Sequence, residues 1–270
     1  MKVYKRGEGS PEIAIIGGIH GDEPCGVDAI NRFLETNIQI NKPVKFIVAN
    51  EKALNQETRY IDTDLNRAFE TKLEANSHEG KLARQIADEV EDCVVLSIHS
   101  TQSFSEPFGL VKRINQQVKT ICTRLSITSL VETGNIVEGR LFATTPSTII
   151  EIEAGKQGSD KAAENAYRIL REFLTATNAI PGETISRTLP IYRLEYELPK
   201  PSGKNYTTSV TNFEKVSPGD IYASADGTEY VADDEFYPIL VSPYGYENKF
   251  GYAGSHQGEI EPEQNTRLSN

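Results

Sequence analysis

The sequence predicts an α/β fold in which helices cover both faces of a sheet, and two patterns carry that prediction. Residues 13–16 are a continuous apolar run that stops at two glycines, which is typical of a strand buried on both faces of a parallel sheet. Apolar residues then recur with helical spacing over residues 27–34, behind Pro24, which a first helical turn tolerates. The alternation of strand and helix repeats along the chain, and such alternation indicates a sheet between helices.

The same patterns predict the remaining elements and the domain organisation. We expect strands over 44–48, 93–98 and 148–152, and helices around 82–90 and 163–174. Beyond about Ala179 the sequence pattern changes to alternating apolar and charged residues, which is typical of strands. Asp226-Gly227 predicts a hairpin between strands at 220–223 and 228–231. Another strand is expected at 236–241. We therefore predict a catalytic domain over 1–179, a smaller β-rich domain over 180–256 and a polar, flexible tail over 257–270.

Composition and charge exclude several classes of protein. The 270 residues include 28 basic and 39 acidic side chains, a net charge of −11, which argues against binding to nucleic acid because such proteins concentrate Lys and Arg. No run approaches the 18 or so apolar residues that span a membrane, and residues 1–8 do not resemble a secretory signal. Three widely spaced cysteines without a CxxC motif suit a reducing compartment, so we expect a cytoplasmic protein.

Two of the four histidines follow predicted strands and are candidate metal ligands. His20 and Glu23 lie three residues apart after the first strand, and His99 follows the strand at 93–98. The carboxyl ends of strands in open α/β sheets are where ligands bind, so the three side chains can meet there. Two histidines and a glutamate with an open fourth position are a catalytic zinc set, although a single histidine at a strand end is more often hydrogen-bonded structure. His78 and His256 lie in polar surroundings and are read as surface residues.

Two carboxylates near the end of the strand at 148–152 are candidates for acid–base chemistry. Glu151 and Glu153 are at i and i+2, so they share one face of the strand. Either could act, and Glu153 is preferred because it is nearer the carboxyl end of the strand. For Glu151 the alternatives are a salt bridge and an exposed strand face.

Several of these features together resemble a known family. His20-Gly21-Asp22-Glu23, the run from Arg59 to Arg67 (RYIDTDLNR), the strand end at His99 and Ile152-Glu153-Ala154-Gly155 are similar to motifs of the aspartoacylase and succinylglutamate desuccinylase family, whose members are relatives of zinc carboxypeptidases. The resemblance covers about residues 13–158. It implies a zinc-carboxypeptidase-like mixed sheet flanked by helices and one Zn²⁺ per chain on His20, Glu23 and His99.

The resemblance also assigns roles around that metal. Glu153 matches the base that activates water and then protonates the leaving amine, and Arg59 matches the residue that stabilises the oxyanion. Asn66 and Arg67 form a clamp for a substrate carboxylate, because a guanidinium presents a planar fork, although a solvated loop is the alternative. Asp64 orients a ligating histidine through its other nitrogen.

One departure from the family concerns the substrate. Aspartoacylases have an arginine about ten residues before the base, and Ala143 stands there in this chain, with Arg140 as a candidate substitute. Tyr244 and Tyr246 are candidates to close over the substrate. These features leave the acyl group and the amino acid open.

The predicted function is hydrolysis of the amide bond of an N-acyl amino acid that carries carboxylate groups, by a metal-activated water. The alternatives are a metallocarboxypeptidase or muropeptide amidase that uses the same ligands on a longer substrate, and a metal-binding pseudo-enzyme. Arg59 and Glu153 speak against the last, since metal binding alone needs neither. Nucleic acid and membranes are not expected partners, and a homodimer is left open.

Overall fold

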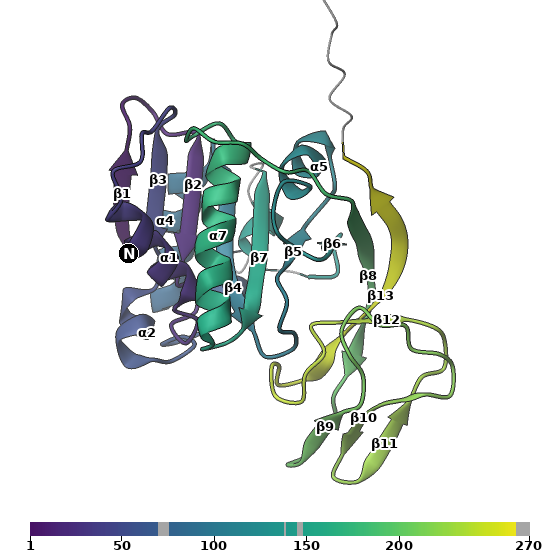
Figure 1. Cartoon of the computed structure of the whole chain (residues 1–270). Helices are drawn as coiled ribbons and strands as arrows, with labels where there is room; N and C mark the ends of the chain where they lie inside the picture. The colour runs from purple at the N-terminus through teal and green to yellow at the C-terminus, as the bar shows by residue number, and fades with distance from the viewer. Residues whose placement is uncertain (70–75, 138, 145–147, 263–270) are drawn as a thin grey trace, which may run out of the picture.

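A ten-stranded mixed sheet forms the frame of the molecule (Figure 1). The computed structural model describes residues 1–69, 76–137, 139–144 and 148–262. In spatial order the strands are β1 (Lys2–Arg6), β3 (Val44–Val48), β2 (Ile13–Gly17), β4 (Val94–Thr101), β7 (Ile149–Lys156), β5 (Phe108–Val111), β6 (Leu130–Glu132), β8 (Leu189–Pro199), β13 (Lys249–Ile260) and β12 (Tyr237–Ile239). The four strands β3-β2-β4-β7 are parallel, whereas β1, β5, β12 and β13 each have antiparallel pairings, so the predicted mixed α/β sheet is confirmed.

Helices cover both faces of the parallel part of this sheet. In Figure 1, α7 and α1 lie in front of β2 and β4, and α4 lies behind. The helices are α1 (Cys25–Leu34), α2 (Glu51–Gln56), α3 (Leu65–Ala68), α4 (His78–Val90), α5 (Gln116–Cys122), α6 (Leu141–Thr144) and α7 (Asp160–Ala176). The helices predicted around 27–34, 82–90 and 163–174 are therefore confirmed, and α1 begins directly after Pro24.

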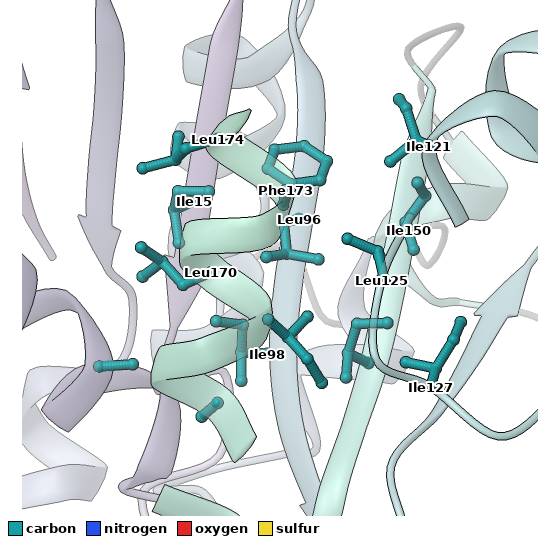
Figure 2. Packing of buried hydrophobic residues seen from close by; sticks show 14 of the residues in the cluster. Ile15, Leu96, Ile98, Ile121, Leu125, Ile127, Ile150, Leu170, Phe173 and Leu174 are labelled. Carbon is teal, nitrogen blue, oxygen red and sulfur yellow. The ribbon is translucent and has the colours of Figure 1, made fainter. Parts of the chain in front are cut away.

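Alternate residues of the central strands build one hydrophobic layer on each face. Ile15 points toward α1 and α7, whereas its neighbours Ala14 and Ile16 belong to the cluster under α4. Figure 2 shows the first layer, in which Leu170 and Phe173 of α7 lie over the sheet. Fully burying a side chain of this size contributes roughly 1.5–3 kcal/mol, so the parallel strands form a rigid base for the residues at their carboxyl ends.

Two strands extend further than their apolar residues predicted. β4 continues past Ile98 to Thr101, so His99 lies within the strand and not after it. It does so because β7 also continues, to Lys156, and pairs with it.

The predicted tail is wrong at its start, since β13 runs to Ile260 and pairs with β8. Ile260 is buried in the core, which explains why this polar stretch is ordered, while residues 263–270 lie outside the described part.

The C-terminal third contributes to two sheets. β8, β12 and β13 complete the edge of the large sheet, and β9 (Tyr206–Thr208), β10 (Ile221–Ala225) and β11 (Thr228–Val231) form a separate three-stranded sheet with its own hydrophobic cluster. Asp226 and Gly227 make the predicted hairpin turn, with φ values of 47° and 85°. Because β8 pairs with β6 across residue 180, a domain boundary at that point stays a prediction.

No helix within the described ranges has both the length and the apolar composition needed to cross a bilayer.

Candidate active site

The three predicted metal ligands come together at the carboxyl end of β2 and β4. We call His20, Glu23 and His99 the ligand group. Nδ1 of His20 lies 2.8 Å from one carboxylate oxygen of Glu23, and Nδ1 of His99 lies 3.1 Å from the other. All three side chains are buried, and each offers a ligand atom within 4.8 Å of the others. The group therefore has the donor types and the spacing of a site for one divalent cation.

Local sequence shapes the loop that carries two of these ligands. The chain leaves β2 at Gly17, places His20 and Glu23 in a turn, and enters α1 at Cys25. Gly21 packs against the backbone of Ala53 at the start of α2, where an added Cβ would lie 2.1 Å from the Ala53 carbonyl carbon. The Gly21 amide also donates to the carbonyl of Arg59. Only glycine fits this contact, which fixes the ligand loop against the neighbouring loop.

The second ring nitrogen of each histidine is also engaged. Nε2 of His20 lies 3.0 Å from Oδ1 of Asp64, and Nε2 of His99 lies 3.1 Å from Oγ of Ser97 on the same strand. Such partners fix ring orientation and leave Nδ1 of each ring directed at Glu23. Burial acts to lower the pKa of His20, but the Glu23 charge and the hydrogen bonds of Asp64 and Glu23 raise that pKa to about 9.

Arg59 connects the acidic residues around the ligand group. Its Nη1 donates to Glu23 at 3.0 Å, and its Nε and Nη2 donate to Oδ2 of Asp64 at 3.2 and 3.1 Å. Burial alone would raise the pKa values of both carboxyls, but His20 lowers each of them, and Arg59 adds to the effect on Asp64. Both groups are therefore charged at neutral pH.

Glu153 faces the ligand group from the next strand. In the parallel pairing of β4 with β7, it lies directly opposite His99. Its carboxyl is buried, and Oε2 has no hydrogen-bond partner among the described residues. Burial is the main reason that the pKa of Glu153 is raised to about 7. A carboxyl with that pKa can both accept and return a proton near neutral pH.

Three further residues that line the same cavity share this incomplete hydrogen bonding: Asn66, Arg140 and Ser100, whose Oγ has no partner among the described residues. We call Asn66, Arg140 and Glu153 the reaction group. Each of them is buried, lines the same cavity as the ligand group and has one nitrogen or oxygen without a partner among the described residues: Oδ1 of Asn66, Nε of Arg140 and Oε2 of Glu153. Buried polar atoms are nearly always paired in native proteins, so these three exceptions and Ser100 Oγ in one cavity indicate a place where another molecule binds.

Two adjoining cavities meet at Arg59. The cavity between the ligand and reaction groups has a volume of about 40 Å³, enough for a water or two. The neighbouring cavity measures about 660 Å³, and Arg67 lines this one and not the smaller one. Tyr246 lines both, whereas Tyr244 lines only the larger and is 60% exposed. The structure thus brings Asn66, but not Arg67, onto the wall beside the predicted ligands.

Comparison with known proteins finds similarity to one family of amide hydrolases. The family model for the succinylglutamate desuccinylase/aspartoacylase catalytic domain matches residues 10–136. The chain is 27% identical to a probable aspartoacylase of Nostoc sp. over 88% of this chain and 92% of that protein. It is 26% identical to aspartoacylase of Xenopus tropicalis over 88% and 89% of the two chains.

These matches support the resemblance of the chain to the succinylglutamate desuccinylase/aspartoacylase family. Among solved structures, succinylglutamate desuccinylase from Vibrio parahaemolyticus superposes with a TM-score of 0.73 and 14% identity, covering 94% of this chain and 86% of that one. That likeness establishes a shared fold. The matched segment includes every residue of the ligand group and the 59–67 loop, whereas Glu153 lies beyond it.

The residue that holds the 59–67 loop in place is one that the sequence did not indicate. Glu79, fully buried in the first turn of α4, accepts hydrogen bonds from the amides of Ile61, Asp62 and Thr63 and from the side chain of Asn50. Burial raises the pKa of Glu79, but these donors together bring it below the usual value. An acidic residue in a first helical turn is ordinary, so the sequence carries no signal for this role.

His78 differs from its predicted surface setting. It does begin α4, but its ring is half-buried, and Nε2 lies 3.1 Å from Oδ1 of Asn50. His256 is exposed, as predicted.

The structure also places Ala143 and Arg140, the two residues considered for the arginine that aspartoacylases have before the base. Ala143 lies in α6, and its side chain is outside the described part. Arg140 lines the smaller cavity and forms a buried ion pair with Glu151, its Nη1 donating to Oε2 at 2.5 Å. The salt-bridge alternative for Glu151 is therefore confirmed.

Proposed function

We propose that this chain is a zinc-dependent amidohydrolase that cleaves the amide bond of an N-acyl amino acid. The observation that carries the proposal is the position of Glu153, which faces a buried group of two histidines and a glutamate across one small cavity. Similarity to the family supports the same class of reaction, since the matched relatives are named probable aspartoacylase and aspartoacylase.

The residues present fit a bound zinc ion. Nδ1 of His20, Nδ1 of His99 and a carboxylate oxygen of Glu23 would hold it, while Asp64 and Ser97 fix the two rings. When bound, Zn²⁺ acts as a Lewis acid that polarises the scissile carbonyl and makes water more acidic.

The protein's own residues supply the proton transfers and the electrostatics. Glu153 accepts a proton from the attacking water as the oxygen adds to the amide carbon, and it returns that proton to the nitrogen as the carbon–nitrogen bond breaks. Arg59 places a fixed positive charge beside the developing oxyanion. Asn66 and Arg67 hold a carboxylate of the substrate from the two adjoining cavities.

Cavity size favours a small substrate over the carboxypeptidase and muropeptide alternatives. The larger cavity, at about 660 Å³, lies within the range of roughly 300–1,000 Å³ typical of sites for small molecules. A peptide-length substrate would need a longer cleft beside the ligand group.

An amine-release assay tests the proposal. Purified protein is stripped with a chelator, reloaded with Zn²⁺, Co²⁺ or Mn²⁺ and assayed on a panel of N-acyl amino acids, with peptides and muropeptides as comparison substrates. Hydrolysis of an N-acyl amino acid that disappears with the metal and returns with zinc is the expected result. Metal binding without hydrolysis of any substrate would favour the pseudo-enzyme, and cleavage of peptides alone would favour the carboxypeptidase.

A cytoplasmic location belongs to the same proposal. Cys25, Cys93 and Cys122 are all free and buried, which suits a reducing compartment. Fractionation of the producing cells tests the location. A homodimer is also part of the proposal, and light scattering of the purified protein measures it.

A further inference from the structure

The buried ion pair between Arg140 and Glu151 bears on which substrate this site takes. Arg140 is 5% exposed and Glu151 is 1% exposed, so both charges are removed from water. Arg140 lines the small cavity beside Glu153. Glu151 also accepts a hydrogen bond from Asn66 at 3.4 Å. Its carboxylate therefore contacts both Arg140 and Asn66, the two members of the reaction group other than Glu153.

This pair leaves little net positive charge for a second substrate carboxylate. The two arginines that line the small cavity are Arg59 and Arg140, among the residues that the structure describes. Arg59 is paired with Glu23 and Asp64, and Arg140 is paired with Glu151. A further carboxylate placed against Arg140 would also lie near Glu151 and Glu153 in a site with little water. Repulsion between like charges is strong under those conditions.

Arg140 nevertheless keeps hydrogen-bonding capacity. A guanidinium has five N–H groups, and its Nε has no partner among the described residues. An uncharged acceptor, such as a carboxamide oxygen or an acyl carbonyl, satisfies that donor without adding negative charge. The wall made by Arg140 and Glu151 therefore suits a neutral polar group.

We infer that the substrate is an N-acyl amino acid with a single carboxylate, and that the group facing Arg140 is uncharged and accepts a hydrogen bond. This inference rests on the proposed amidohydrolase function and adds a specificity to it. Glu151 is then a specificity-determining residue, because its charge cancels that of Arg140.

Two matched pairs of substrates test the inference on the zinc-loaded wild type. N-acetyl-L-asparagine and N-acetyl-L-aspartate have the same shape and differ by one charge on the side chain. N-succinamoyl-L-alanine and N-succinyl-L-alanine likewise have the same shape and differ by one charge at the acyl end. We expect the singly charged member of each pair to have the higher kcat/KM, by about tenfold or more. A preference for the doubly charged member of either pair would overturn the inference and leave the amidohydrolase function standing.

Substitutions of the ion pair separate its charge from its structural role. Glu151→Gln keeps an acceptor for Arg140 but unmasks its charge, so the ratio of kcat/KM for asparagine to aspartate substrates should fall about tenfold. The double variant Arg140→Gln/Glu151→Gln lacks both charges and should restore the ratio toward wild type. It also keeps the protein testable if the single variant does not fold, since removing both members of a buried pair is far less damaging than removing one.

A control variant accounts for non-specific effects of losing a carboxylate. Glu132→Gln removes an acid that pairs with Arg193 elsewhere on the same sheet, and the substrate ratio should not change. An unchanged ratio in Glu151→Gln, with folding verified by circular dichroism, would overturn the role of Glu151. Hydrolysis of none of the N-acyl amino acids by zinc-loaded wild type would overturn the proposed function and this inference together.

Discussion

The ligand group and the reaction group lie side by side in one cavity, but they differ in how completely their polar atoms are paired. Every ring nitrogen and carboxylate oxygen of His20, Glu23 and His99 has a partner in the protein. Each member of the reaction group keeps one buried atom without a partner among the described residues. The first group is held rigid by the protein itself, whereas the second has hydrogen-bonding capacity that solvent or substrate can fill. Variants that remove members of one group or the other test this difference.

The largest effect should follow from removing the ligand group. His20→Ala/His99→Ala is expected to lose about one zinc per chain and all turnover, because two of three protein ligands are gone. Elemental analysis after purification with added zinc measures the metal. His256→Ala, which removes an exposed histidine, is the control and should keep it. Equal zinc in the double variant and wild type would refute the assigned ligands.

Glu153→Gln should separate the two groups functionally. The variant is expected to retain zinc and to lose about 10²–10⁴-fold in kcat, because an amide cannot accept the proton from water. Steady-state kinetics and metal analysis on the same preparation measure both. Glu164→Gln, at an exposed position on α7, should behave as wild type. Turnover of Glu153→Gln near the wild-type level would mean that another residue is the base.

Arg67→Lys tests the part of the clamp that lies in the larger cavity. Loss of a charged hydrogen bond is worth about 1.5–3 kcal/mol, so kcat/KM should fall about 10- to 100-fold, because an ammonium lacks the planar fork of a guanidinium. Initial rates over a range of substrate concentrations give the value. If kcat/KM is unchanged, Arg67 does not hold the substrate carboxylate.

The pH profile should show the titration of the reaction group. Glu153 acts as a base only when ionised, and its pKa is raised to about 7 by burial. The rate constant kcat/KM should therefore be constant above that pH and fall about tenfold per unit below it. Protons compete with the metal for the ligand histidines, so zinc content is measured at each pH. A flat profile from pH 5 to 8 with full zinc occupancy would contradict the assignment.

The smallest effect should come from the residue that supports the 59–67 loop. Glu79→Gln replaces a carboxylate that accepts three backbone hydrogen bonds, so we expect a loss of about 1.5–3 kcal/mol in the free energy of unfolding. Because the pKa of Glu79 is lowered in the folded state, its contribution is present at neutral pH and lost as the pH falls through the acid range. Urea unfolding at pH 7 and pH 4 measures both. A difference between variant and wild type that grows at pH 4 would contradict this role.

Structural features that neighbouring residues determine were predictable from the sequence, whereas features that depend on distant residues were not. The central strands and the long helices were predictable, because Ile13–Ile16 and the apolar stripe of α7 reflect burial that neighbouring residues share. The ends of β4 and β13 were not, because Thr101 and Gly258 continue their strands only through pairing with partners distant in sequence.

The sequence by itself determined which residues stand at the ends of the first strands, because His20 and Glu23 are placed by a short loop and a helix start that neighbouring residues specify. Only the tertiary structure decided that Arg140 is neutralised by Glu151 and that Glu79 supports the loop at 61–63. It also decided that Arg67 faces the larger cavity. The residues that Glu151 and Glu79 contact here are 11 to 18 positions away in the sequence. The order of the strands and the packing of the helices bring them together. The energies of these contacts depend on burial and distance in the folded chain, which residue spacing does not encode.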